Sequence, residues 1–290
     1  MKSLAILLSS GLLLTTSVIA IQAASADEDE VTTGCQKIYN AITTIRGATL
    51  YDKLGRAMTD GHALGKGLPL RQWGTIVDRD GIVCAVVTSG GPGGTDLNLQ
   101  WLGSRVISAQ KANTANAFSV TGLALSTANL YAATQPGGSL YGLQFSNPVS
   151  TAAAYGDNQN CHKVGCDDTD APRYGQRDDP LVGRYVGGVN VFGGGLALYD
   201  SGGQLIGGLG TSGNTSCADH YISWVIRHNL GLDYVSKGVA DGGADDNIIF
   251  DNTGATGTFV SMSGFGHPLC GIDLDEKNYP YELSHQYPVR

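Results

Sequence analysis

The stretch LIGGLGTSG, residues Leu205–Gly213, decides the fold that this chain is expected to adopt. Its apolar and glycine residues are typical of a buried strand. Its polar end leads into a helix expected at about Thr215–Asn229, with Gly231 as the C-cap. Two shorter strands are expected before it, at Val189–Phe192 and Leu196–Tyr199. This order favours an α/β (α+β) domain, in which helices pack on a mainly antiparallel sheet.

Elements nearer the N-terminus indicate the same fold class. β-rich runs on both sides of Asp78-Arg79-Asp80-Gly81 predict a hairpin within Trp73–Val87, because glycine adopts the positive φ of a tight turn. Ser104–Phe118 is predicted to be a helix with Ser104 as its N-cap, and a second helix is expected at about Leu123–Ala133. One or two short strands are expected in the C-terminal tail, at Ile248–Phe250 and Thr258–Val260.

Composition limits the class of protein. The chain has 290 residues, of which 42% are hydrophobic, enough for the core of one large domain or two small ones. Its 42 glycines are about twice the ordinary share and follow no Gly-X-Y period, which excludes collagen. With 18 basic against 26 acidic residues, the formal net charge of −8 speaks against a nucleic-acid binder.

The N-terminus predicts export to the periplasm or the cell exterior. Lys2, the apolar run Leu4–Ile21 and the small residues Ala24-Ser25-Ala26 are typical of a signal peptide, whose removal leaves no membrane span. A membrane anchor is the alternative, because the run is close to the length of a span. The expected organisation is a signal peptide (1–26), an N-terminal helical segment (27–67), a central domain (68–232) with a loop insertion (157–180), and a C-terminal extension packed on that domain (233–290).

All six cysteines follow the predicted signal peptide, and an even number in an exported chain suggests disulfides. Pairing in chain order, the simplest arrangement, gives Cys35–Cys84, Cys161–Cys166 and Cys217–Cys270. The alternative for the middle pair is a metal site that includes His162 and Asp167.

Four motifs occur in a fixed order along the chain: TIVDRDG (75–81), AQKANTA (109–115), GGV (187–189) and LIGGLGTSG (205–213). In this order they resemble the GlcG/HbpS-like haem-binding family, which includes the C-terminal domain of PduO-type corrinoid adenosyltransferases. The resemblance covers about 68–231. It implies a PAS- or profilin-like domain that forms homo-oligomers and binds haem or a related tetrapyrrole. The Cys161–Cys166 loop and the tail beyond Asp233 depart from the family pattern.

The start of the final helix is the first candidate ligand site. Free backbone N–H groups at a helix N-terminus can bind a carboxylate such as a haem propionate. On one face of the helix, His220 would lie near the iron, Trp224 beside the ring and Arg227 near a propionate. The alternative is that capping and structural contacts explain these residues. The predicted ligand-binding residues in this segment are Ser212, Gly213, Asn214, Thr215, His220, Trp224 and Arg227.

Lys111 is the second candidate. It lies on a largely apolar helix stripe with Thr114 and Phe118, and we include all three in the predicted site. The lysine could meet an anionic ligand or act as a base with a lowered pKa, and the alternative is that it snorkels into water. We expect the lysine helix and the glycine-ended strand to border a hollow for a flat anionic guest.

Three functions follow from these observations. The first is an exported, non-covalent haem- or tetrapyrrole-binding protein, with haem iron on His220. The second is an enzyme acting on small hydroxy- or keto-carboxylates through Lys111, and the third is a ligand-free structural subunit. The sequence has no Gly-x-Ser-x-Gly, Walker or His-Glu-x-x-His motif, so no catalytic residue is predicted and a binding protein is favoured.

Overall fold

The structure is a computed structural model that describes residues 26–90, 101–155, 173–255 and 258–290, with side chains described from residue 33 onward. Nearly all of the predicted signal peptide, the Cys161–Cys166 pair with its alternative metal site, and most of the loop insertion lie outside the described residues. Within the described ranges, no helix is long and apolar enough to cross a membrane.

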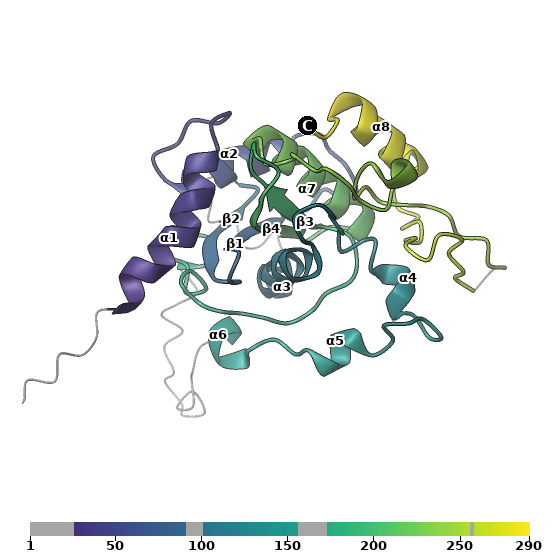
Figure 1. Ribbon diagram of the computed structural model, residues 1–290, viewed down its shortest axis with the longest axis horizontal. Helices are drawn as coiled ribbons and strands as arrows, with labels where there is room; N and C mark the ends of the chain where they lie inside the picture. The colour runs from purple at the N-terminus through teal and green to yellow at the C-terminus, as the bar shows by residue number, and fades with distance from the viewer. Residues whose placement is uncertain (1–25, 91–100, 156–172, 256–257) are drawn as a thin grey trace, which may run out of the picture.

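A four-stranded sheet lies at the centre of the described structure (Figure 1). Its strands are β1 (Trp73–Asp78), β2 (Val83–Thr88), β3 (Gly195–Tyr199) and β4 (Leu205–Ser212), in the spatial order β2-β1-β4-β3. Each neighbouring pair is antiparallel, and Trp73 of β1 lies opposite Thr88 of β2 and Ser212 of β4. The predicted fold class, helices on a mainly antiparallel sheet, is confirmed.

Helices cover both faces of this sheet. Helix α3 (Gly103–Phe118) packs on one face, against β4, β1 and β3, whereas α2 (Leu50–His62) and α7 (Ser216–Leu230) pack on the other (Figure 1). Side chains alternate accordingly along β1: Ile76 belongs to the core beneath α2 and α7, and Val77 to the core beneath α3. The sheet therefore separates two apolar layers.

Helix α1 lies beside α2, and helix α8 of the C-terminal extension packs on α7. The other described elements are short. The bounds of all these elements are α1 (Ala26–Ala41), α4 (Tyr131–Thr134), α5 (Leu143–Ser146), α6 (Thr151–Tyr155), the 3₁₀ helices η3 (Asp241–Gly243) and η4 (Glu276–Asn278), and α8 (Tyr279–Gln286).

The predicted hairpin and the predicted final helix are confirmed. Oδ1 of Asp78 accepts hydrogen bonds from the N–H groups of Asp80 and Ile82, at 3.0 and 2.9 Å, and Gly81 completes the turn with a φ of 89°. These bonds show that the Asp78 side chain stabilises the turn, as aspartate side chains commonly do. The final helix is α7, and Gly231 ends it in the left-handed conformation with a φ of 68°.

Two helix predictions need correction. Helix α3 begins before Ser104, and the residue that precedes the helix is itself in the α region (φ −58°) and makes no side-chain cap, so Ser104 is not the N-cap. The predicted helix Leu123–Ala133 is wrong for most of its length, because turns occupy it until α4 begins. Side chains of Ser119 and Asn129 bind backbone N–H groups there, at 3.0 Å each, and replace the helical partners.

Three strand predictions are also wrong. Between Val189 and Phe192, backbone N–H groups bind other segments: the N–H of Asn190 donates to the Thr114 hydroxyl at 2.9 Å. The segments Ile248–Phe250 and Thr258–Val260 form no strand, and an isolated bridge joins Asn252 to Ser261 instead. In each case side chains or loops supply the bonds that a sheet edge would have supplied.

Two of the three predicted disulfides are confirmed, and the third lies outside the described residues. Cys35–Cys84 joins α1 to β2, and Cys217–Cys270 joins the start of α7 to the C-terminal extension. The second bond holds the extension against the helix that carries most of the predicted ligand residues.

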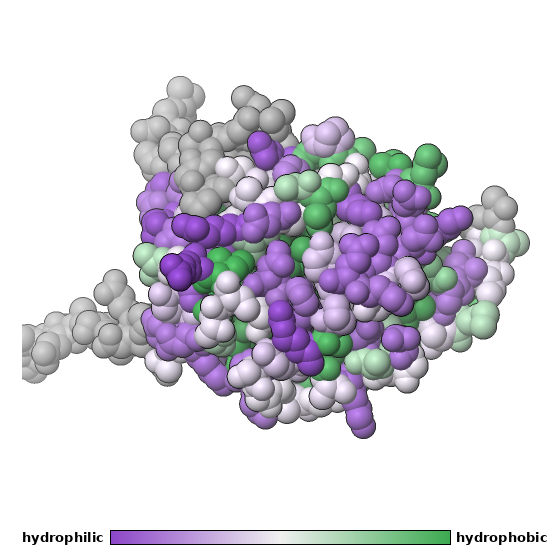
Figure 2. Space-filling model, turned by 90° about the horizontal axis from the view of Figure 1, so that it is seen from above, coloured by the Kyte–Doolittle hydropathy of each residue, from purple (hydrophilic) through white to green (hydrophobic). Residues whose placement is uncertain are grey.

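The surface is mixed in character. The face in Figure 2 is mostly hydrophilic, with small hydrophobic areas between polar side chains. Large exposed apolar side chains include a group near α5 and α6 (Tyr141, Phe145, Tyr155) and several in the extension, such as Met262 and Leu274.

Candidate functional site

The two predicted ligand elements, α3 and the start of α7, meet at a buried ion pair. Lys111 is fully buried, and its Nζ lies 2.8 Å from Oδ2 of Asp219 and 3.0 Å from the carbonyl oxygen of Thr211. Burial lowers the pKa of Lys111 and raises the pKa of Asp219, while the attraction between the two groups opposes both shifts. The lysine does not snorkel into water, and the anion that it meets is the chain's own Asp219.

The hollow expected between the lysine helix and the glycine-ended strand is filled by the helix itself. A Cβ atom at Gly210 would lie 2.0 Å from the carbonyl oxygen of Ser108, and one at Gly208 would lie 2.2 Å from that of Ala112. The glycines of β4 therefore let the backbone of α3 lie directly on the strand. Close packing explains the glycine pattern, and no flat guest fits between α3 and β4.

The predicted anion site at Ser212–Thr215 is likewise closed by the chain's own groups. Oδ1 of Asp219 accepts a hydrogen bond from the N–H of Asn214 at 3.1 Å, and the Thr215 hydroxyl accepts one from the N–H of Ala218 at 3.2 Å. The Asn214 side chain is buried and bridges to the segment before β1. Internal capping satisfies the donors that a propionate would have used.

The α7 face that carries His220 packs against the C-terminal extension. Nε2 of His220 accepts a hydrogen bond from a backbone N–H of the extension at 3.1 Å, and Nε1 of Trp224 donates to a backbone carbonyl there at 2.8 Å. Arg227 forms two bonds to the carboxylate of Asp246, at 2.7 and 2.8 Å. Burial lowers the pKa of His220 to about 3, so the ring is neutral. All three α7 side chains are at most 1% exposed, which leaves a ligand no access to them.

The other two predicted residues of α3 differ from each other. Thr114 is fully buried, and its hydroxyl donates to the carbonyl of Gln110 at 2.7 Å while it accepts from Asn190. Phe118 is half-buried at the end of the helix and lines a cleft. Of the ten predicted ligand residues, Phe118 is the one that the structure places on the wall of this cleft.

This cleft, of about 610 Å³, lies where the C-terminal half of α3 faces the segment before β3. Gly187 and Gly188 have φ values of 63° and 78°, in the left-handed region that favours glycine. A Cβ atom at Gly188 would lie 2.7 Å from the Gln110 side chain, so a larger residue would push the segment away from α3. The cleft is lined by Asn113, Ala117, Phe118, Ser146, Asn147, Pro148, Val149, Ser150, Tyr185, Val186, Gly187, Gly188 and Val189.

Tyr185 carries an exposed phenol on this wall. Its side chain is 57% exposed, and its hydroxyl has no hydrogen-bond partner among the described residues. The ring lies against Gly81 and Gly187, where a Cβ atom would be 2.8 and 3.6 Å from it. Its neighbour Arg184 is exposed, with no side-chain partner in the described ranges. The cleft therefore combines walls of mixed apolar and polar side chains with a phenol, and an exposed arginine precedes that tyrosine in the sequence.

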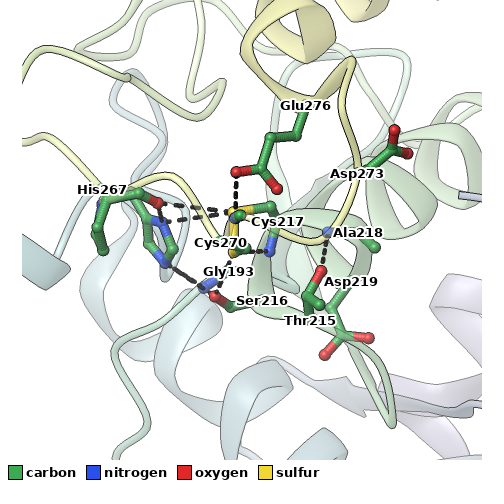
Figure 3. Close-up of a disulfide and its surroundings, with 12 residues drawn as sticks. Gly193, Thr215, Ser216, Cys217, Ala218, Asp219, His267, Cys270, Asp273 and Glu276 are labelled. Atoms are coloured by element: carbon green, nitrogen blue, oxygen red, sulfur yellow. Dashed lines mark hydrogen bonds between the residues drawn. A yellow bond between two sulfur atoms is a disulfide. The ribbon is translucent and has the colours of Figure 1, made fainter. Parts of the chain in front are cut away.

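A second cluster surrounds the Cys217–Cys270 disulfide (Figure 3). Both sulfur atoms and one ring nitrogen of His267 lie within 4.8 Å of one another. His267 is 1% exposed, and burial lowers its pKa to about 4, so the ring is neutral. Glu276 lies close by, 4% exposed, and its Oε2 is buried without a hydrogen-bond partner among the described residues.

Sequence reasoning missed both clusters, although each has a signal. His267-Pro-Leu-Cys270 has the His-x-x-Cys spacing of a chelating pair, but its third member, Cys217, is distant in the sequence. The cleft borders the GGV motif, yet its opposite wall comes from α3 and from residues 146–150, which no periodicity connects to that motif.

Comparisons with known proteins agree with the resemblance drawn from the motifs. Residues 96–224 match the model of a family described as haem degrading protein HbpS-like. No curated protein matches the chain. Among solved structures, protein ORFY of Klebsiella pneumoniae is 20% identical, with a TM-score of 0.38, and the match covers 62% of this chain and 87% of that one. The structure of a PduOC–haem complex is 24% identical, with a TM-score of 0.38, and the match covers 63% of this chain and 95% of that one. The family match is thus confined to residues 96–224, less than half of the chain, and within that region the chain is similar to the HbpS-like family.

Proposed function

We propose that this protein binds haem or a related tetrapyrrole, without a covalent bond, in the cleft between the end of α3 and the Tyr185–Val189 segment. The observation that carries the proposal is the cleft itself. It has about 610 Å³, both apolar and polar wall residues and an accessible phenol, and all of its lining residues lie inside the region matched by a family named for haem degradation. Its volume is within the range of small-molecule sites.

The residues of the cleft suit the parts of a haem. Phe118, Pro148 and Val149 offer apolar surface to a macrocycle. The Tyr185 phenol offers an oxygen to the iron, a ligand that some haem proteins use. The free guanidinium of Arg184 offers a partner to a propionate.

This placement replaces the one expected on α7. His220 keeps the role of a buried acceptor for the extension, because the iron would have to displace that packing to reach it. The same argument counts against a carboxylate enzyme based on Lys111, whose ammonium is bound to Asp219 and sealed from substrate. A ligand-free structural subunit remains the rival, and it differs from our proposal in binding no haemin.

We further propose that the protein is exported and forms homo-oligomers. Two disulfides support export, since such bonds persist in oxidising compartments. The exposed aromatic side chains near α5 and α6, Tyr141, Phe145 and Tyr155, support contact between copies of the chain. Sedimentation of the mature protein with and without haemin tests the assembly.

A haemin titration with a blocking variant tests the site. Ala117 is exposed on α3 and lines the cleft, so Ala117→Trp fills the cleft without altering the core. Gln286→Trp, exposed on α8 at the opposite side of the molecule (Figure 1), is the matched control. We expect saturable Soret changes in the wild type and the control, and a dissociation constant at least about tenfold higher in Ala117→Trp, roughly 1.4 kcal/mol of binding free energy. Equal affinity in the two Trp variants, or no binding at all, would contradict the proposal.

Tyr185→Phe tests the iron ligand separately. The variant keeps the ring that packs on Gly81 and removes only the phenol oxygen. We expect haemin still to enter the cleft, with an altered ferric spectrum and weaker binding. A spectrum identical to the wild type would assign the iron to another ligand while leaving the cleft in place.

A further inference from the structure

We propose that Cys217, His267 and Cys270 form a zinc site when their disulfide is reduced. The two sulfur atoms and one ring nitrogen of His267 already lie within 4.8 Å of one another. Two thiolates and a neutral imidazole are ligands that zinc prefers, and zinc binds them in a tetrahedron. The proposal concerns a different part of the molecule from the haem cleft and does not depend on it.

The start of α7 prepares the two sulfur ligands. Cys217 lies in the first turn of the helix, and its N–H donates to Sγ of Cys270 at 3.1 Å. The hydroxyl of Ser216 lies 3.4 Å from the same sulfur (Figure 3). A helix N-terminus and hydrogen-bond donors stabilise a thiolate, which is the form that binds metal. These donors would hold Cys270 in place after the disulfide opens.

His267 supplies the nitrogen ligand. Its Nδ1 lies 4.0 Å from Sγ of Cys217, and zinc bound to both would bring them to roughly 3.6 Å apart. At present Nδ1 lies 2.7 Å from the carbonyl oxygen of Pro268, and Nε2 lies 3.2 Å from the Ser216 hydroxyl. When Nδ1 binds zinc, the ring proton resides on Nε2 and is donated to Ser216, while the contact with Pro268 and the long hydrogen bond that Nε2 accepts from the N–H of Gly193, at 3.5 Å, are given up. A small rotation of the ring thus converts it into a ligand.

Glu276 lies next to the cluster, but its carboxylate is outside the group of ligand atoms that lie within 4.8 Å of one another, so it would have to move to supply the fourth ligand. Its Oε1 accepts a hydrogen bond from the N–H of Gly271 at 2.6 Å, whereas its buried Oε2 has no hydrogen-bond partner among the described residues. In Figure 3 the carboxylate lies on one side of the disulfide and Ser216 on the other. A buried carboxylate oxygen without a partner is costly, and a cation beside it removes that cost.

Reduction and metal binding form a balanced sequence. A dithiol reductant attacks the sulfur of Cys270, which is more exposed than that of Cys217, and the Cys217 thiolate leaves. The second thiol of the reductant then releases Cys270, so the reductant departs as a cyclic disulfide and the protein gains two electrons and two protons. Zinc replaces those two protons, which pass to the solvent. A cyclic disulfide oxidant reverses the sequence: it accepts the two electrons from the thiolates and is released as the dithiol, and the metal leaves when the protein disulfide forms again.

Cobalt titration of the full-length mature protein tests the site. The protein is reduced with a water-soluble phosphine, and Co²⁺ reports thiolate ligands by its intense near-ultraviolet absorption. We expect this absorption in the reduced protein, its loss on adding Zn²⁺, and none in the oxidised protein. Cys161→Ser/Cys166→Ser, which removes the other candidate cysteine metal site, keeps the absorption, and Cys270→Ser in that background removes it. His267→Asn weakens cobalt binding at least about tenfold.

Cys84→Ser is the matched control, because it removes one thiol from the other described disulfide. Asp78, the acidic neighbour of that disulfide, already accepts the turn N–H groups and brings no imidazole. The cobalt absorption therefore persists in Cys84→Ser. If a variant fails to fold, X-ray absorption spectroscopy of the zinc-loaded, reduced wild type replaces it. This measurement counts the sulfur atoms bound to zinc, and the proposal predicts two. No cobalt absorption in the reduced wild type, its survival when Cys270→Ser is added to Cys161→Ser/Cys166→Ser, or a zinc shell without sulfur would overturn the proposal.

Discussion

Replacing Lys111 by methionine probes the contact that joins α3 to α7. Methionine keeps most of the length of the side chain and removes the ammonium from Asp219, which then retains Gln72 and Asn214 as donors, at 2.8 and 3.1 Å. Both charges are at most 1% exposed. Removing one partner of such a buried pair costs about 3–5 kcal/mol, because the other charge stays buried without compensation.

Urea denaturation at pH 7 with the disulfides intact measures this loss. With a slope of about 3 kcal/mol per molar, the unfolding midpoint is expected to fall by about 1 to 1.7 M. The double variant Lys111→Met/Asp219→Asn carries no buried charge at this position, while its amide oxygen can still accept from the N–H of Asn214. We expect it to regain a large part of the lost stability.

The pH dependence supplies a second measurement on the same variant. In Lys111→Met, burial still raises the pKa of Asp219, and the cation that opposed this rise is gone. A carboxyl with a raised folded pKa binds more protons in the folded state, so stability falls as pH rises from the unfolded value of 3.8 through the folded one. The destabilisation is therefore smaller at pH 5 than at pH 8. A loss below about 1 kcal/mol at both pH values would refute the reasoning, because it would match an exposed pair.

Three further predictions concern the packing that closes the interior. Gly210→Ala places a Cβ atom 2.0 Å from the carbonyl oxygen of Ser108, so thermal melts should show a free energy of unfolding lower by at least about 1–3 kcal/mol. The control Gly103→Ala has open space around the new Cβ atom and should change the free energy of unfolding by less than about 0.5 kcal/mol in the same melts. Arg227→Met leaves the buried carboxylate that pairs with Arg227 without its cation, so urea denaturation should show a loss of about 3–5 kcal/mol, and an unchanged midpoint would contradict this. The folded pKa of His220 is depressed to about 3, so the unfolded state binds more protons than the folded state below about pH 6.5, and stability is lost as pH falls from there toward 3. His220→Gln should therefore flatten the dependence of the free energy of unfolding on pH between pH 7 and pH 4.

The sheet and its turns were predictable because their signals are local. The Asp-Gly turn at Gly81 and the glycine C-cap at Gly231 each follow from a few neighbouring residues, and both occur as expected. The two described disulfides also follow chain order. The continuous apolar and glycine run at Leu205–Ser212 identifies β4 correctly, because such a run is typical of a strand that is buried on both faces.

The candidate site was less predictable because it depends on distant partners. Lys111 looks available for a ligand until Asp219, more than a hundred residues away, is seen to neutralise it. His220 and Arg227 likewise look like one free helix face until the C-terminal extension covers them. A helical periodicity shows which residues share a face and does not show which segment covers it. The same limit hid the cleft.

The central claim is that a tetrapyrrole lies beside the end of α3 and not beneath α7. Hydrogen exchange of the mature protein, measured with and without haemin, locates the ligand without any substitution. The account predicts slower exchange in residues 113–118, 146–150 and 185–189, with no change at the capped start of α7. Protection confined to residues 212–224, or none anywhere under saturating haemin, would contradict it.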